Sequence, residues 1–562
     1  MGDDGSLAPE APASASSTRS ARARKILRWI ALSAAVIGLG ALIVQQLFLV
    51  GDFRVDDAYI SFSFAKNLAA GEGLVYSHGL RVEGYSNFLW VLVVSLGFLV
   101  APSADPYITA RLFGFAFLGL GVFATYRLTR LRAPTWAAFG AVGLLLVSSD
   151  VFRATLSGLE TVPFMSALAF GWYAYLKEPP EARRWSLCAF LPVALMRIDG
   201  FGPMGFVIAF ELASSIVERR FRLKTFARWL AVPVLVWGAY FLARWAYYGL
   251  PLPTTYYAKS MVNANEPLRG WNQLWAFVHD YGVWALAPFM ILAVARGPRR
   301  PALALAGAVL AQVFYAASVG GDWMPFQRFF LPIFPLCAVL TAWGVARVWD
   351  ERWCPAWVRA AGTLVAAAAV GYAGVCMNMG SIETPEERYK LREARHVTRH
   401  THENLLSVMD LARYVVREPG DKFVTDFAGV FAVYTEATVI DMWGLCNADI
   451  ALNGGLNGIN PIYGKECAAC YARIQPDYFH TGVPMVRRAD KFSSVGQMLG
   501  SIFQGRAIDR VIGLRENFAA GRVVEEATGR VFWFLERRRA ERPLVERRPA
   551  PGIRVDYPFE PG

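Results

Sequence analysis

Apolar segments long enough to cross a membrane recur along the first 377 residues of the chain and then stop. A spanning helix needs about 20 mostly apolar residues, and by that measure we expect about eleven spans. Only 18% of the 562 residues are charged, whereas a soluble globular protein has about a quarter. The sequence therefore predicts a polytopic α-helical membrane protein with a polar C-terminal domain. The predicted spans are 26–50, 107–126, 134–149, 161–177, 186–196, 201–217, 228–246, 281–296, 301–318, 329–347 and 357–377.

Basic clusters predict the orientation of these helices. All six lie on one side of the membrane if the short apolar segment Phe88 to Val100 is an interfacial or re-entrant helix. Loops rich in Lys and Arg mark the cytoplasmic side, so we expect 1–25 to be a disordered cytoplasmic tail and 378–562 an extracytoplasmic α/β domain. We interpret the clusters as topology signals and contacts to membrane lipids, so the net charge of +12 does not indicate nucleic-acid binding. They are 19–25, 127–132, 177–184, 219–224, 296–300 and 347–352.

Acidic and basic residues collect in the loops of the predicted outer side. A carboxylate beside a low-dielectric surface suits a general base or a divalent metal ion, and cations at that depth suit a phosphate leaving group. Together they predict transfer from a phosphate-linked donor to a hydroxyl acceptor. The carboxylates are Asp56, Asp57, Glu83, Glu160, Asp199 and Asp322, and the candidate phosphate-binding cations are Arg111, Arg197, Lys259 and Arg328.

Two of these carboxylates, Asp56 and Asp57, are adjacent and begin a segment with the pattern of an amphipathic helix in the membrane interface. Negative charge is favourable at a helix N-terminus, and Gly71 and Gly73 are expected to end the segment. Neighbouring residues on a helix point about 100° apart. We therefore expect only one of the two carboxylates to face a reacting centre, although a solvated surface role is the common alternative for such a pair.

Three outer segments resemble a known family. They are "DDAYISFSFAKNLAAGEGLVYSHGLRVEGYSNFLW", "GLPLPTTYYAKS" and "GGDWMPFQRFFLP". The chain resembles the GT-C superfamily of polyprenyl-phosphate-dependent glycosyltransferases, and within it the branch that includes mycobacterial terminal arabinofuranosyltransferases. The resemblance implies a GT-C helical bundle over 26–377 with a catalytic first outer loop, 51–106, in the inner membrane of a bacterium.

The resemblance also implies a reaction and a set of site residues. A sugar, either a pentose such as arabinofuranose or a hexose, would pass with inversion from a polyprenyl phosphate to a cell-envelope glycan or lipid. Asp57, or else Asp56, would act as the base. Asp56, Glu83 and Glu160 would hold a divalent metal ion, although the chain reads Glu83-Gly84-Tyr85 where related lipid A aminoarabinose transferases have Glu-Lys-Pro. The other predicted substrate-binding residues are Tyr85, Asn87, Tyr257 and Asp322.

Two other classes of function fit a polytopic chain. A transporter favours ionisable residues in mid-membrane and an internal repeat, whereas here the ionisable residues lie at one face and no repeat is evident. A noncatalytic membrane scaffold of the same fold is the second alternative. The intact acidic and basic residues of the outer loops favour the enzyme.

The polar C-terminal part is predicted to be an α/β domain. We expect a helix over 396–420 and strands over 422–426, 437–445, 509–514 and 530–538. In an oxidising compartment the cysteines predict a disulfide, either Cys467–Cys470 or one that involves Cys446. His396 and His400 have helical i,i+4 spacing but no acidic partner nearby, so we do not expect a metal site there. Asp426 and Asp441 are predicted to cap strand ends.

Overall fold

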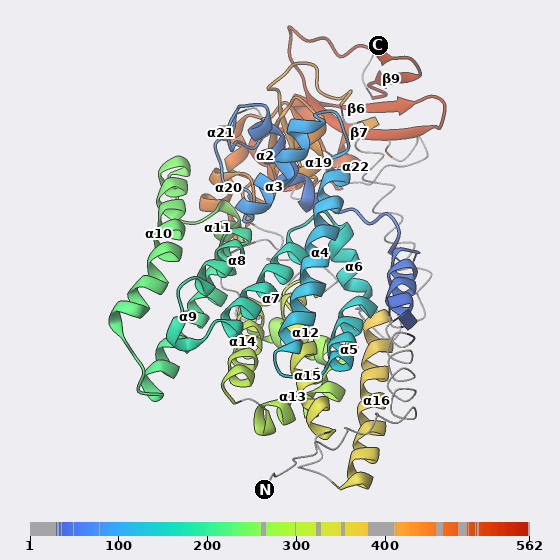
Figure 1. Cartoon of the computed structure of the whole chain (residues 1–562). Helices are drawn as coiled ribbons and strands as arrows, with labels where there is room; N and C mark the ends of the chain where they lie inside the picture. Colours follow the sequence, from blue (N-terminus) through green and yellow to red (C-terminus); the bar gives the residue numbers. More distant parts are fainter. Residues whose placement is uncertain are drawn as a thin grey trace, which may run out of the picture.

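The computed structural model describes most of the chain in stretches. These are 30–379 without 31, 32, 35, 49, 78, 260–265, 298, 322–326 and 350–354, then 410–456 without 412, 465–480, 492, 494–500, 502 and 505–559. A helical bundle forms one part of the molecule, and a sheet domain sits at one end of it (Figure 1).

Six helices in the described part of the chain are long and apolar enough to cross a membrane, or up to eight spans if two bent helix pairs count as one span each. The bent pairs are α5 with α6, at 61°, and α12 with α13, at 87°. The predicted number of eleven is thus not confirmed, although several apolar helices are. The six helices are α4 (Pro106–Arg130), α9 (Phe201–Val217) with η3 (Ile198–Gly200), α10 (Leu223–Tyr248), α14 (Arg299–Ser318), α15 (Phe334–Val348) with η4 (Leu331–Ile333), and α16 (Ala356–Met379).

The remaining bundle helices are shorter, and this explains much of the difference in number. The predicted span 186–196 is only 11 residues long, about half of what a spanning helix needs. The predicted span 161–177 is α7, which lies largely buried in the middle of the bundle. The shorter helices are α5 (Thr135–Val147), α6 (Ser149–Leu156), α7 (Thr161–Lys177), η1 (Pro180–Ala182), η2 (Ser186–Phe190), α8 (Leu191–Met196), α11 (Thr254–Lys259), α12 (Glu266–Asp280) and α13 (Val283–Arg296).

The first outer loop contains two helices, α2 (Asp56–Ala69) and α3 (Phe88–Val100), between the bundle and the sheet domain (Figure 1). α3 has 13 residues, too few to span a bilayer, as expected. α2 ends before Gly71 and Gly73, which both have positive φ, again as expected. Unlike the predicted amphipathic helix, however, α2 is buried continuously from Ala58 to Ala65. Protein covers it on both sides because the sheet domain packs onto it.

The sheet domain has a seven-stranded mixed sheet of order β2-β1-β5-β7-β6-β9-β8, in which only the β1–β2 and β1–β5 pairs are parallel. The predicted strands 422–426, 437–445 and 530–538 are confirmed as β1, β2 and β7. The predicted strand 509–514 is wrong, because its first four residues end a helix, α23 (Gly505–Ile512), and Leu514 begins the next helix. The strands are β1 (Lys422–Thr425), β2 (Thr438–Asp441), β5 (Tyr478–His480), β6 (Phe518–Glu525), β7 (Arg530–Arg537), β8 (Arg547–Ala550) and β9 (Ile553–Asp556).

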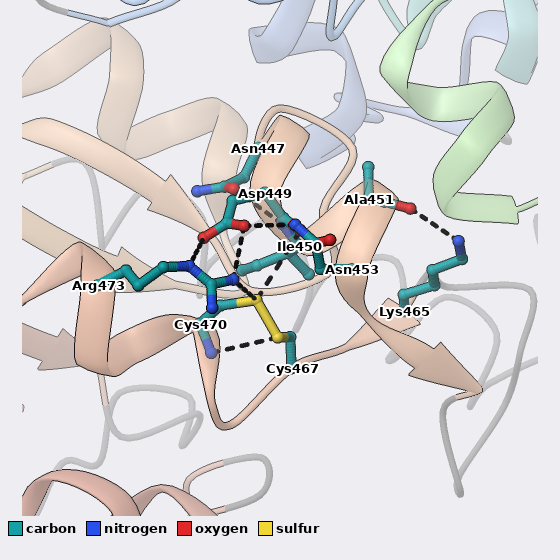
Figure 2. Close-up of a disulfide and its surroundings, with 9 residues drawn as sticks. All are labelled: Asn447, Asp449, Ile450, Ala451, Asn453, Lys465, Cys467, Cys470 and Arg473. Carbon is teal, nitrogen blue, oxygen red and sulfur yellow. Dashed lines mark hydrogen bonds and ion pairs between the residues drawn. A yellow bond between two sulfur atoms is a disulfide. The ribbon is translucent and has the colours of Figure 1, made fainter.

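Short elements surround this sheet, and one of them carries a disulfide. Cys467 and Cys470 are bonded at the start of α21 (Cys470–Ile474), next to the Arg473–Asp449 ion pair (Figure 2). This confirms the first predicted pairing, and Cys446 is a buried free thiol. The predicted helix 396–420 lies mostly outside the described residues, as do His396 and His400. The other elements are α19 (Ala428–Tyr434), α20 (Ala448–Asn453), β3 (Gly455–Leu456), β4 (Lys465–Glu466), α22 (Val495–Leu499) and α24 (Leu514–Asn517).

Candidate active site

Asp56 joins the first outer loop to the sheet domain. Helix α19 begins after Phe427 with no side-chain cap of its own. The Asp56 carboxylate accepts hydrogen bonds from the backbone N–H groups of Gly429, at 3.1 Å, and Val430, at 2.9 Å. A carboxylate at this position both satisfies unpaired helix donors and favours the helix dipole. Asp56 is therefore the missing cap of a helix more than 370 residues away in the sequence.

The contact between α2 and α19 is close along its length. A Cβ atom on Gly429 would come within 2.1 Å of the Asp56 backbone oxygen, so only glycine fits there. Tyr76 Oη donates to the carbonyl of Ala428 at 2.6 Å, and Lys66 Nζ donates to that of Val433 at 2.7 Å. Burial raises the pKa of the Asp56 carboxyl to about 8, against the opposing effect of its two backbone donors. The junction is thus tightly packed around a carboxyl group.

Asp57 has a different environment. It lines a cavity of about 410 Å³, consistent with the angle of about 100° between neighbouring helical residues. The first outer loop, the segment after α8, and helices α11, α12 and α14 contribute to the cavity walls, and Leu445 of the sheet domain closes one side. Of the two adjacent carboxylates, only Asp57 belongs to this pocket.

A buried polar network forms part of the pocket wall. Asn87 donates to Glu160 at 2.8 Å and also bonds Ser61 at 2.9 Å. Arg197 donates to Glu160 at 3.2 Å and, through two nitrogens, to Asp199 at 2.9 and 3.1 Å. Two carboxylates therefore surround one guanidinium. Because its charge is already more than balanced, Arg197 is better suited to position Glu160 and Asn87 than to bind a phosphate.

Three other cations line the same pocket: Lys259, Arg269 and Arg328. Lys259 ends α11, and Arg269 lies in the first turn of α12. Arg328 comes soon after the segment 322–326, which lies outside the described residues. The sequence predicted Lys259 and Arg328 but not Arg269, because it stands before the predicted span 281–296 and carries no motif. Arg269 Nε donates to the carbonyl of Gly320 at 2.7 Å, which places it beside the "GGDWMPFQRFF" segment.

Glu83 forms a buried ion pair with Arg244 of α10. Both Arg244 Nε and Nη2 donate to the carboxylate, at 2.9 Å and 2.6 Å, and each side chain is only 3% exposed. The backbone oxygen of Glu83 accepts from Thr254 Oγ1 at 2.6 Å, and the same hydroxyl bonds the carbonyl of Leu445 at 2.7 Å. This cluster ties the first outer loop to α10, to α11 and to the sheet domain.

The predicted metal ligands do not fit a common ion. Asp56 caps α19, Glu83 forms an ion pair with Arg244, and Glu160 accepts hydrogen bonds from Asn87 and Arg197. Within the described stretches, no group of three or more His, Cys, Asp or Glu side chains is arranged to hold a metal. The arrangement therefore does not support the predicted site.

The structure places the other predicted site residues as follows. Tyr85 lines the pocket and bonds Tyr248 through its hydroxyl at 3.2 Å. Tyr257 is not among the lining residues, and its neighbour Tyr256 is. Arg111 is also outside the lining, and it donates to the backbone oxygens of Phe53 and Leu156 at 2.9 and 3.2 Å. Asp322 lies outside the described residues.

The two aspartates predicted to cap strand ends, Asp441 and Asp426, have different partners. Asp441 is fully buried at the end of β2 and accepts from the backbone N–H groups of Trp443 and Cys446, both at 2.9 Å. Burial raises the pKa of this carboxyl to about 6. The Cys446 thiol in this turn lies against Gly84, where a Cβ atom would be only 2.3 Å from the sulfur. Asp426, after β1, instead bonds the buried His480 at 2.8 Å.

Comparison with known proteins supports the predicted resemblance. No family model matches the chain. It is 27% identical over 341 residues to a terminal β-(1->2)-arabinofuranosyltransferase of Corynebacterium glutamicum, covering 53% of this chain and 49% of that protein. The chain thus matches about half the length of this curated relative.

The fold is similar to that of a solved structure. ArnT from Cupriavidus metallidurans, bound to undecaprenyl phosphate, has a TM-score of 0.51 and 13% identity over 80% of this chain and 93% of that one. The mycobacterial arabinofuranosyltransferase AftD has a TM-score of 0.43 and 12% identity over 92% of this chain and 40% of that one. The chain therefore shares the fold of ArnT, a GT-C membrane glycosyltransferase, and is similar in sequence to a terminal arabinofuranosyltransferase.

Proposed function

We propose that the chain is a membrane glycosyltransferase that moves a sugar from a polyprenyl phosphate to a hydroxyl of a cell-envelope glycan or lipid. The sequence similarity makes arabinofuranose the first candidate sugar. The undecaprenyl phosphate bound in ArnT makes a polyprenyl phosphate the first candidate carrier. We place the reaction at the extracytoplasmic face of the bacterial inner membrane, on the side of the sheet domain.

The observation that carries the proposal is the composition of one pocket. Asp57 and three cations, Lys259, Arg269 and Arg328, all line it. A carboxylate provides a proton acceptor, and cations stabilise the negative charge that develops on a departing phosphate. A second cluster in the wall, around Arg197, carries its own counter-charges. The three cations are the candidates for phosphate binding because they line the same pocket as Asp57, and Arg197, held between two carboxylates, is a candidate positioning residue.

The proposed step is a single displacement at the anomeric carbon. Asp57 takes the proton of the acceptor hydroxyl, and the hydroxyl oxygen forms a bond to the anomeric carbon. The bond from that carbon to the phosphate oxygen breaks at the same time, and its electron pair leaves with the polyprenyl phosphate. Attack opposite to the leaving group inverts the anomeric configuration. The proton on Asp57 then passes to solvent or to the released phosphate.

The pocket walls suggest how the two substrates are separated. Tyr85 and Asn87 come from the first outer loop near Asp57, whereas Tyr256 and Lys259 come from α11. Aromatic side chains offer flat faces for sugar rings, and Tyr256 is 53% exposed. A donor bound on the cation side would present its anomeric carbon toward Asp57, with the acceptor on the loop side. This division assigns the phosphate to α11 and α12 and the acceptor hydroxyl to α2.

The test is a donor panel. Purified protein in lipid nanodiscs is incubated with radiolabelled polyprenyl-phosphate arabinose, mannose, glucose and galactose, together with an envelope glycan fraction as acceptor. We expect one labelled sugar to be transferred, with inversion seen by NMR of the product, and excess unlabelled undecaprenyl phosphate to inhibit. Folded protein that transfers none of the sugars to any acceptor fraction would contradict the proposal and favour the scaffold alternative.

A further inference from the structure

A second cavity, of about 280 Å³, lies at the far end of helices α9 and α10 from the candidate active site. α9 begins beside Asp199 of the first pocket and ends at Val217, and its 17 residues correspond to a length of about 26 Å. α10 begins next to the second cavity and ends near Arg244, the partner of Glu83. The two sites therefore stand at opposite ends of the same pair of helices.

The second cavity has an excess of positive charge. Four arginines line it, Arg183, Arg219, Arg220 and Arg222, against two glutamates, Glu181 and Glu211. Three of these arginines come from the short connection between α9 and α10. Cations that line a concave, partly protein-walled site repel one another unless an anion joins them.

The base of the cavity is organised by one buried carboxylate. Glu211 is 3% exposed and accepts from Tyr175 Oη at 2.7 Å and Arg220 Nη1 at 2.8 Å. Arg183 Nε lies 3.1 Å from the same carboxylate, and Arg300 Nη2 donates to it at 2.8 Å. One negative charge thus faces three guanidinium groups.

The neighbouring glutamate, Glu218, does not neutralise the remaining positive charge at the cavity. Glu218 accepts from Arg220 Nε at 2.5 Å and lies 3.4 Å from Arg300. Within the described part of the chain, Arg220 Nη2 is buried and has no hydrogen-bond acceptor. A buried guanidinium nitrogen without an acceptor is costly. Arg219, the next residue, has a left-handed backbone with φ of 53°, a conformation that a non-glycine residue adopts rarely.

Topology signalling alone does not account for this arrangement. A positive-inside signal requires only lysines and arginines in an exposed loop. Here Arg183 is 4% exposed, its guanidinium carbon stands 3.7 Å from the centre of the Tyr175 ring, and a glutamate is buried to hold it. Such an arrangement fixes guanidinium groups around a cavity, as a binding site does.

We propose that the second cavity binds a phosphate group, with Arg220 and Arg183 at its base and Arg219 and Arg222 at its mouth. Arginine forks match phosphate oxygens in pairs, and a phosphate oxygen supplies the acceptor that Arg220 Nη2 lacks. The phosphate is either the headgroup of an anionic lipid or a soluble phosphomonoester. This site does not depend on the transferase reaction, and it remains if the proposed function fails.

The experiment measures retained ligand on the full-length protein. The protein is reconstituted in nanodiscs of phosphatidylcholine with one-fifth phosphatidic acid, released in the mass spectrometer, and scored for bound lipid. A parallel sample in pure phosphatidylcholine nanodiscs is titrated with glycerol 3-phosphate and followed by ³¹P NMR line broadening. The variants are Arg220→Gln and the double variant Arg219→Gln with Arg222→Gln. Arg228→Gln is the matched control, because Arg228 is exposed near the start of α10, between the lining residues Phe226 and Trp229, and does not itself line the cavity.

We expect a single retained phosphatidic acid or a saturable glycerol 3-phosphate signal in the wild type and in the control. Both cavity variants should weaken that binding about 10- to 100-fold, the usual effect of losing one charge-assisted hydrogen bond. Retention of lipid alone identifies a lipid site, and broadening by glycerol 3-phosphate identifies a soluble ligand. Equal binding in all four proteins, or no binding of either probe to folded wild type, would overturn the proposal.

Discussion

Single substitutions of the two adjacent carboxylates of the first outer loop should have different effects: one should lower stability, and the other should lower catalytic turnover. Asp56→Ala removes the acceptor of two backbone N–H groups of α19, at 3.1 and 2.9 Å. Each buried donor left without a partner costs about 1–3 kcal/mol, and loss of a helix cap alone costs about 0.5–2 kcal/mol. We therefore expect Asp56→Ala to lower the free energy of unfolding by about 2–4 kcal/mol.

Asp57→Asn should have the opposite profile. It keeps the size and shape of the side chain in the pocket but removes the proton acceptor, so turnover should fall about 10²- to 10⁴-fold. At about 1.4 kcal/mol per tenfold change, this loss corresponds to about 3–5.5 kcal/mol of the activation barrier. The free energy of unfolding should fall by less than in Asp56→Ala, because Asn has nearly the same size and shape as Asp.

The assay combines thermal unfolding of the purified proteins with transfer of labelled sugar under single-turnover conditions. Glu72→Gln, an exposed substitution in the same loop, is the control for both measurements. Asp57→Asn that stays folded with wild-type turnover would remove Asp57 from the chemistry. If Asp56→Ala instead loses only activity and keeps its unfolding temperature, the assignment of the two roles is reversed.

Three further outcomes follow from the site. Lys259→Ala should raise the donor KM or lower kcat about 10- to 100-fold through loss of a charge-assisted bond, with unchanged kinetics contradicting its role. Gly84→Ala should destabilise the protein because its Cβ meets the Cys446 sulfur at 2.3 Å, and Cys446→Ala should restore part of the loss, as thermal unfolding of the double variant will show. The pKa values of Asp56 and Asp441, about 8 and 6, exceed the ordinary value of 3.8, so the folded state binds protons more tightly. Unfolding temperature should therefore fall as pH rises from 5 to 8, and Asp441→Asn should flatten that slope.

Local sequence patterns predicted the outline of the fold because they reflect local physics. Apolar runs of sufficient length became helices, the glycines after α2 ended it, and the short run at α3 stayed too short to span. Counting spans was less successful. An apolar run does not show whether a helix such as α7 crosses lipid or lies buried among other helices, since both environments favour the same residues.

The sequence identified residues of the pocket whose role follows from their own chemistry, and it did not identify contacts with residues that are distant in the chain. Asp57, Glu160, Lys259 and Arg328 from the outer-loop argument, and Asn87 from the family resemblance, all line the pocket. The sequence could not show which distant residue neutralises each charge. Arg244 is 161 residues from the Glu83 that it holds, and an arginine within a predicted span gives no sign of that partner. Nor could it show that Asp56, Glu83 and Glu160, the predicted metal ligands, each have other partners.

The structure also changes the interpretation of the sheet domain. It is more than an accessory module beside the bundle, because three of its parts contact the first outer loop or the pocket. The Asp56 carboxylate caps α19, and the Cys446 sulfur packs against Gly84. Leu445 lines the pocket, and its carbonyl bonds the same Thr254 hydroxyl as the carbonyl of Glu83. These contacts fix the segment that carries Asp57 on both sides. The paired carboxylates then have a physical explanation: Asp56 binds the loop to the domain, and this bond holds its neighbour toward the pocket. If so, a chain without the sheet domain will lose turnover even with every proposed catalytic and phosphate-binding residue in place.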